Sequence, residues 1–86
     1  MGNIILKDFA QQHGLTENDM LDMLKKANII KPDNSISGVK YAFCERFYDE
    51  IDLYESIVCC YDIVKNESWW EITPKGQSVL EKILDI

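Results

Sequence analysis

"LKDFAQQHGLTENDMLDMLKK", residues 6–26, decides the fold that we predict for this chain of 86 residues. Gly14 follows a segment with helical apolar periodicity, at the position where a left-handed residue commonly ends a helix. Thr16 has Asp19 three residues later, a spacing typical of the capping box that begins a helix. Lysines close the second segment, where they complement the helix dipole. The stretch therefore predicts two helices joined by a tight turn.

The spacing between these two segments is that of a helix-turn-helix. The motif needs a small residue on its first helix, a turn glycine about four positions later, and an apolar residue about six positions after that. Ala10, Gly14 and Met20 occupy those places. His13 occupies a core position that is normally apolar, so the match departs from the pattern there. An ordinary helical hairpin with a glycine turn is the alternative.

Beyond the helix pair, the chain predicts a loop, a small antiparallel sheet and a closing helix. Pro32, Asn34 and Gly38 mark the loop. Residues 39–47 fit either a short helix or a strand, and a short strand over residues 3–5 precedes the first helix. Stretches rich in β-branched and aromatic residues are typical of strands. They span residues 48–55, 56–64 and 68–73.

Thr73 and Pro74 predict the start of the last helix, as N-cap and first helical residue. Trp69 and Trp70 are adjacent in the last strand and should point to opposite faces, one of them packing in the core against this helix. The order of elements predicts one α+β domain over residues 1–86. It is a winged helix-turn-helix with N-terminal helices, a small antiparallel β-sheet and a C-terminal helix.

Charge and composition narrow the classes of function. The net charge is −6 and the isoelectric point is near 4.6. Residues 49–67 hold six carboxylates against one lysine, a net charge of −5, which opposes direct binding of phosphate. The sequence has a single histidine, no nucleophile beside a base and no glycine-rich phosphate loop. These observations argue against an enzyme. We expect no catalytic residue and no cofactor.

The three cysteines, Cys44, Cys59 and Cys60, form no C-x-x-C pair. With one histidine they provide no plausible zinc ligand set, so we expect no metal site. The general burial of free cysteine predicts small buried hydrophobes at all three positions. A redox role is the alternative. Because no apolar run approaches the ~20 residues of a membrane span and no signal-peptide pattern is present, we expect a cytoplasmic location.

Four segments of the chain have counterparts in one known family: "LKDFAQQHG" (6–14), "MLKKANIIK" (23–31), "CERFYDEIDLYE" (44–55) and "TPKGQSVLEKIL" (73–84). Together they resemble the C-terminal domain of phage antirepressors of the KilA-C type. That family opens with a helix-turn-helix and ends on a T-x-K-G-Q helix, which is the most specific of the matching elements. Its loop is commonly more basic and polar than the one here. The resemblance implies a regulator from a phage or mobile element.

The acidic stretch "ERFYDEIDLYE", residues 45–55, is the candidate partner-binding site. Tyrosine anchors with a carboxylate rim suit a basic protein surface, because complementary charge steers association. The residues that we expect to carry binding are Tyr48, Asp49, Glu50, Asp52, Tyr54 and Glu55. The simpler alternative is a charged strand edge that only prevents unwanted pairing. The binding interpretation predicts an antirepressor-like inhibitor that occludes a DNA-binding protein of the host or of a rival element.

A winged-helix transcription regulator is the rival hypothesis. Base-contacting side chains lie in the first turns of the second helix of the motif, and these turns carry Glu17, Asn18, Asp19 and Asp22. Carboxylates there would be repelled by DNA phosphates. Direct binding would need a basic stripe from Lys7, Lys25, Lys26, Lys31 and Lys40, alone or doubled in a homodimer. A homodimeric assembly module with a large apolar face is the remaining alternative.

Overall fold

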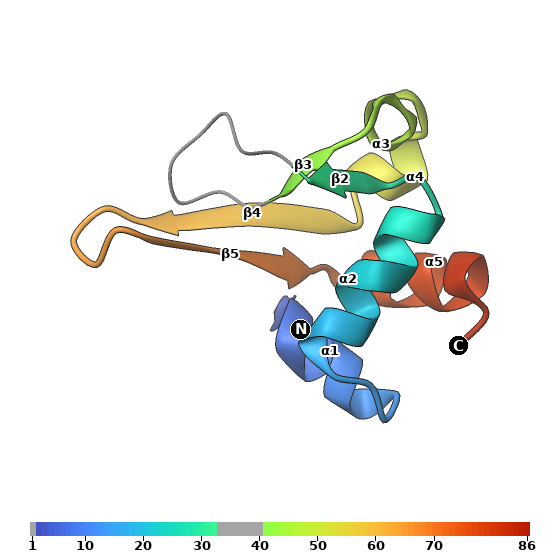
Figure 1. The fold of residues 1–86 in the computed structure, drawn as a ribbon, viewed down its shortest axis with the longest axis horizontal. Coiled ribbons are helices and arrows are strands. Elements are labelled where there is room, and N and C mark those ends of the chain that lie inside the picture. Colours follow the sequence, from blue (N-terminus) through green and yellow to red (C-terminus); the bar gives the residue numbers. More distant parts are fainter. Residues whose placement is uncertain (1, 33–40) are drawn as a thin grey trace.

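The computed structural model describes residues 2–32 and 41–86, which form a small α+β domain (Figure 1). Predictions for residues 33–40, which include most of the expected loop and Lys40, lie outside the described residues. The elements in chain order are β1 (Ile4–Ile5), α1 (Leu6–Gln12), α2 (Glu17–Lys26), β2 (Ile30–Pro32), β3 (Tyr41–Phe43), α3 (Glu45–Asp49), α4 (Ile51–Tyr54), β4 (Ile57–Asp62), β5 (Glu67–Ile72) and α5 (Pro74–Leu84).

The strands form two antiparallel sheets. A three-stranded sheet has the order β1-β5-β4, and β2 pairs with β3 in a two-stranded sheet. The β4–β5 hairpin is in register from Ile57 opposite Ile72 to Asp62 opposite Glu67. In Figure 1 this hairpin projects to the left, while α1, α2 and α5 gather at the other end of the molecule. The two predicted strands over residues 56–64 and 68–73 are therefore confirmed.

The N-terminal helix pair is confirmed as well. Thr16 Oγ1 accepts a hydrogen bond from the Asp19 backbone, and Asp19 accepts one in return from the Thr16 backbone. Gly14 has a φ of +71°, a left-handed conformation that glycine adopts without steric cost. His13 ends α1 half-buried, edge-on to the Phe9 ring. Its Nε2 atom lies 3.1 Å from a carboxylate oxygen of Glu81 on α5, without the geometry of a hydrogen bond.

The predicted strand over residues 48–55 is wrong. This stretch forms the end of α3 and all of α4, with the extended residue Glu50 between the two helices. The helical turns bury Phe47 and Leu53 and leave the carboxylates exposed, a division that alternation along a strand would not give. Burial of these two side chains outweighs the β propensity of the neighbouring tyrosines and isoleucine. The ambiguous residues before it divide between β3 and α3.

The core is one cluster of buried apolar side chains between the helices and the sheets. Its members are Leu6, Phe9, Ala10, Met20, Leu24, Ile29, Ile30, Phe47, Leu53, Ile57, Ile72 and Leu80. Trp70 packs against this cluster, with its ring stacked on Phe43 at 4.9 Å between centroids. Trp70 is therefore the inward tryptophan, and the ring that stacks on it comes from β3. The sequence had predicted the last helix as its packing partner. Trp69 is half-buried and donates from Nε1 to Glu71.

The cysteines differ from the prediction of full burial. Cys59 is exposed, and Cys44 and Cys60 are half-buried. Cys59 lies opposite Trp70, whose Nε1–H points at its sulfur atom at 2.9 Å. Burial and the nearby Glu71 carboxylate raise the pKa of the Cys60 thiol above its ordinary value of 9.0. The edge position of β4 explains why strand residues with a core-like composition remain accessible.

Candidate functional site

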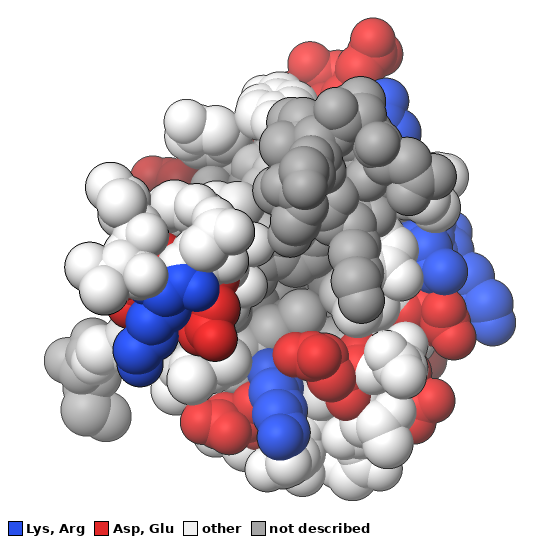
Figure 2. All heavy atoms as spheres, turned by 60° about the vertical axis from the view of Figure 1, so that its left-hand side comes forward, with Lys and Arg blue, Asp and Glu red and all other residues white. Residues whose placement is uncertain are grey.

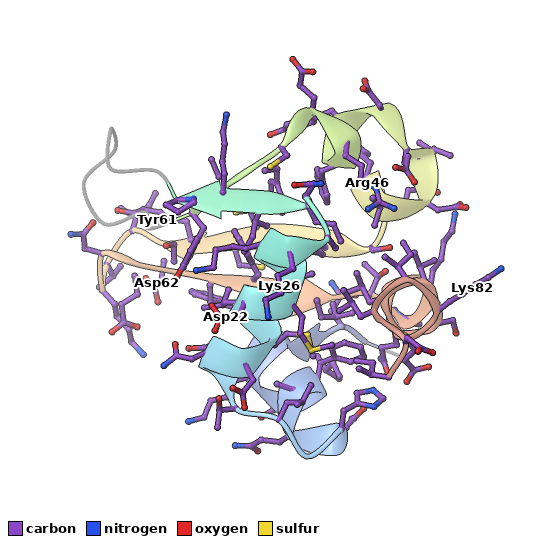
Figure 3. The ribbon with its side chains drawn as sticks, turned by 45° about the vertical axis from the view of Figure 1, so that its right-hand side comes forward. Asp22, Lys26, Arg46, Tyr61, Asp62 and Lys82 are labelled. Atoms are coloured by element: carbon purple, nitrogen blue, oxygen red, sulfur yellow. The ribbon has the colours of Figure 1, made fainter. Side chains whose placement is uncertain are left out.

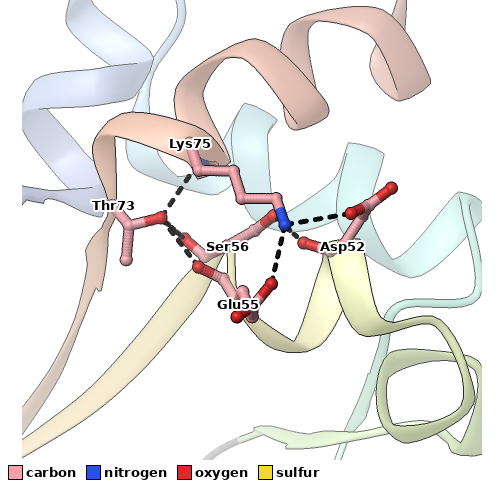
Figure 4. Close-up of polar contacts among 6 residues, drawn as sticks. Asp52, Glu55, Ser56, Thr73 and Lys75 are labelled. Atoms are coloured by element: carbon pink, nitrogen blue, oxygen red, sulfur yellow. Dashed lines mark hydrogen bonds and ion pairs between the residues drawn. The ribbon is translucent and has the colours of Figure 1, made fainter.

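The start of α5 is fastened to the end of α4. Thr73 Oγ1 accepts a hydrogen bond from the Gly76 backbone at 2.9 Å, which confirms the predicted N-cap. The same hydroxyl donates to the carbonyl oxygen of Glu55 at 2.8 Å, and the Thr73 backbone donates to the carbonyl oxygen of Ser56 at 3.0 Å (Figure 4). One threonine thereby joins two helices that are about 20 residues apart in the sequence.

Gly76 allows this close approach. A Cβ atom at this position would stand 2.2 Å from the carbonyl oxygen of Ser56 and 2.7 Å from its Cα atom. Ser56 is itself buried, and its hydroxyl donates to the carbonyl oxygen of Asp52. The glycine is therefore required by the contact between α5 and the α4–β4 junction, and not by a left-handed backbone.

Lys75 engages two of the predicted site carboxylates. Its Nζ lies 2.6 Å from Glu55 Oε1 and 3.0 Å from Asp52 Oδ1. The hydrogen bond to Glu55, and then that to Asp52, raise the pKa of the Lys75 ammonium above its ordinary value of 10.5. The segment Thr73–Gly76 thus fastens the start of α5 to α4. Lys75 partly neutralises the charges of Asp52 and Glu55 (Figure 4).

A third predicted carboxylate is also engaged within the protein. Arg46 projects from α3 towards the end of α2, where its Nη1 donates to the carbonyl oxygen of Ala27 at 2.6 Å (Figure 3). Its Nε donates to Glu50 Oε2, also at 2.6 Å. Because Ala27 caps the C-terminus of α2, the guanidinium lies where a positive charge is favoured by the helix dipole. Arg46, whose guanidinium is also bonded to Glu50, therefore fastens α3 to the end of α2.

The remaining predicted residues lie together at the surface. Tyr48 is 60 % exposed and Tyr54 is 53 % exposed, and their ring centroids are 6.2 Å apart. Asp49 is exposed beside Tyr48, and Glu45 lies four residues earlier on the same side of α3. Within residues 2–32 and 41–86, no ion pair involves Glu45 or Asp49. We call Glu45, Tyr48, Asp49 and Tyr54 the tyrosine surface.

The tyrosine surface borders a shallow apolar groove of about 330 Å³. The groove, which we call the aromatic groove, is lined by Phe43, Phe47, Tyr48, Tyr54, Ile57, Val58 and Cys59. Phe43 and Phe47 stack at 3.8 Å between centroids, and Tyr48 and Tyr54 each contact the Phe47 ring. Sequence reasoning included neither Glu45 nor the groove residues of β3 and β4. Helical rather than strand periodicity over residues 45–55 would have placed Glu45 on the surface with Asp49.

The surface expected for DNA contact is dominated by acidic side chains. Glu17, Asn18, Asp19 and Asp22 are all exposed on α2, and Lys25 pairs with Asp22 at 3.2 Å. Lys7, Lys26 and Lys31 are exposed on three different elements. In the view of Figure 2, Lys and Arg side chains lie in separate groups, each beside Asp or Glu. The described residues on the face drawn in Figure 2 form no continuous basic stripe.

Comparisons with protein-family models, with curated proteins and with solved structures each found no match for this chain. The described residues also contain no group of three or more His, Cys, Asp or Glu side chains arranged to hold a metal ion. In the part of the chain that the structure describes, every helix is too short or too polar to cross a bilayer. The geometry of the tyrosine surface and the aromatic groove is therefore the basis for a functional proposal.

Proposed function

We propose that this chain is a winged-helix regulatory protein that binds and occludes a basic, DNA-binding protein through the tyrosine surface. The winged-helix assignment is supported by connectivity. β1 precedes the α1–α2 pair and is hydrogen-bonded to β5 in the sheet, and we assign the β4–β5 hairpin as the wing. The resemblance to the KilA-C family supports a phage or mobile-element origin and an antirepressor-like role.

The observation that carries the proposal is the pairing of exposed aromatic rings with unengaged carboxylates. Tyrosine is enriched at protein interfaces because its ring is apolar and its hydroxyl is polar. Tyr48 and Tyr54 are more than half exposed yet held in place by contacts with Phe47. Residues 45–55 carry five carboxylates, and among the described residues the cations paired with them are Arg46 and Lys75, so the local net charge is −3. A basic protein surface complements this arrangement.

Occlusion of a DNA-binding protein follows from the charge. A protein that binds DNA presents Lys and Arg side chains to the phosphates, and the same side chains would meet Glu45 and Asp49 of the tyrosine surface. Binding there would compete with DNA for the partner's basic surface. For a DNA-binding role of the chain itself, the described residues of α2 and of the β4–β5 hairpin provide no corresponding basic stripe.

A paired experiment separates the two hypotheses. Immobilised protein is incubated with bacterial lysate that has been treated with nuclease, and captured proteins are identified by mass spectrometry. In parallel, the free protein is tested for retardation of duplex DNA over a range of salt concentrations. Our proposal predicts capture of basic DNA-binding proteins after nuclease treatment and no retardation of DNA. Retardation that falls steeply with salt, together with an empty capture, would establish the transcription-regulator hypothesis instead.

A further inference from the structure

The aromatic groove has a floor and an open rim. Phe47 and Ile57 are buried and belong to the core cluster, so the bottom of the groove is part of the packed interior. Tyr48, Tyr54 and Val58 are exposed at its edge. Because Phe43 stacks on Phe47 and Tyr54 packs at a tilt against Phe47, the groove is maintained by the fold without an occupant. Groove-shaped apolar sites of this kind suit one anchor side chain of a partner.

The size and chemistry of the groove restrict that anchor. A volume of about 330 Å³ is at the lower end for small-ligand sites, and it exceeds the volume of a single leucine or phenylalanine side chain. Its lining offers few polar partners, so an inserted charged or amide group would lose hydration without replacement. The surrounding residues 45–55 and Lys75 have a net charge of −3. The residues that flank the anchor should therefore be basic.

A second copy of this chain is a poor occupant. Among the described residues, the most exposed aliphatic side chains are Ile63 and Val64 at the hairpin turn, which are 83 % and 94 % exposed. Asp62 and Glu67 lie on either side of this turn, and Lys65 is the one positively charged residue between them. Insertion of the turn would therefore bring carboxylates to an acidic rim. Charge complementarity therefore favours a segment of a different, basic protein.

The geometry points to a docking mode in which the aromatic groove receives one leucine-like or aromatic side chain from a lysine- or arginine-rich segment of the partner. This inference deepens the proposed function and rests on it, because it assigns the chemistry of the partner segment that the tyrosine surface binds. Electrostatic attraction to Glu45 and Asp49 brings the segment to the surface. Insertion of the apolar side chain between Tyr54 and Val58 then supplies the selectivity that charge alone lacks.

Synthetic peptides test this mode with the full chain. The first probe is a short lysine- and serine-containing peptide with a central leucine, titrated onto isotope-labelled protein and followed by backbone amide shifts in NMR spectra. We expect shifts centred on Tyr48, Tyr54, Val58 and Cys59. A peptide with serine in place of leucine should bind about ten- to a hundredfold more weakly, since it forgoes burial of the apolar side chain. A peptide with glutamate in place of lysine should not bind.

A matched pair of protein variants assigns the site. Tyr54→Ser removes one wall of the groove, whereas Tyr61→Ser makes the same change at a comparably exposed tyrosine on the hairpin. Loss of leucine-peptide binding should be confined to Tyr54→Ser. Any of three outcomes would overturn the groove assignment. These are equal affinity for the leucine and serine peptides, amide shifts centred elsewhere in the protein, and no binding at millimolar peptide. If nuclease-resistant capture of a basic protein persists in that case, the proposed function stands and only the docking mode fails. If the peptide binds at the groove but no basic protein is captured, the groove assignment stands and the proposed function fails.

Discussion

Gly76 and Ser56 approach so closely that a Cβ atom on residue 76 would stand 2.2 Å from the Ser56 carbonyl oxygen. We predict that Gly76→Ala lowers the free energy of unfolding by roughly 1–3 kcal/mol, the usual cost of an overpacked contact. The gain in helix propensity from glycine to alanine is at most about 1 kcal/mol. The clash outweighs that gain because the opposing atoms belong to backbone and cannot rotate away. Urea denaturation measures the difference.

Ser78→Ala is the control for this prediction, since Ser78 is exposed on the same helix. It should leave stability unchanged or slightly raised, as expected from propensity alone. A Gly76→Ala protein as stable as the wild type would mean that α5 does not rest on the α4–β4 junction in the way described.

Thr73→Ala should lower stability by about 1 kcal/mol, within the range of about 0.5–2 kcal/mol seen for lost N-caps. The substitution removes the acceptor for the Gly76 amide and the donor to the Glu55 carbonyl oxygen. Thr73→Ser retains the hydroxyl and should recover most of the stability. Thermal or urea unfolding of the three proteins checks this order. Equal stability of the alanine and serine variants would contradict a stabilising role for the hydrogen bonds of the Thr73 hydroxyl.

Glu71 gives a prediction for acidic pH. The hydrogen bond from Trp69 Nε1, followed by smaller contributions that include Asn3, holds the pKa of the Glu71 carboxyl below its ordinary value of 4.5. A carboxyl with a lowered folded-state pKa stabilises the fold fully above its unfolded pKa, and the contribution is lost as pH falls through the folded pKa. The stability difference between wild type and Glu71→Gln should therefore be constant near neutral pH and shrink below 4.5. Urea midpoints against pH measure it, and a pH-independent difference would refute the assignment.

The two adjacent cysteines should differ in reactivity. Thiolate is the nucleophilic form of cysteine, and burial together with Glu71 raises the pKa of the Cys60 thiol. We predict that iodoacetamide modifies exposed Cys59 before half-buried Cys60 at neutral pH, as followed by peptide mass spectrometry. Glu71→Gln removes a neighbouring negative charge and should speed modification of Cys60. Faster modification of Cys60 than of Cys59 in the wild type would contradict the described exposure.

The sequence predicted the elements that local chemistry specifies. The Thr16 capping box, the Gly14 turn and the Thr73–Pro74 helix start all depend on residues within a few positions of one another. The β4–β5 hairpin was predictable for the same reason, from β-forming residues on both sides of a short turn. None of these signals requires knowledge of what packs against them.

Residues 45–55 were predicted wrongly because their conformation depends on distant contacts. Tyrosine and isoleucine favour strands, but the helical turns bury Phe47 and Leu53 and keep the carboxylates between them exposed. The use of Asp52 and Glu55 within the protein was equally invisible, since the partner of both is Lys75 on another helix. Glu45 and the aromatic groove become apparent only when β3, α3, α4 and β4 are brought together.

Charge reversal on the tyrosine surface tests the central claim most directly. The variant Glu45→Lys/Asp49→Lys changes two exposed carboxylates that no described ion pair involves. The control, Glu17→Lys/Glu67→Lys, makes the same change in net charge at exposed positions on α2 and β5. Our account predicts that wild type and control capture the same basic DNA-binding proteins from nuclease-treated lysate, and that the Glu45/Asp49 variant does not. Equal capture by both variants would contradict it.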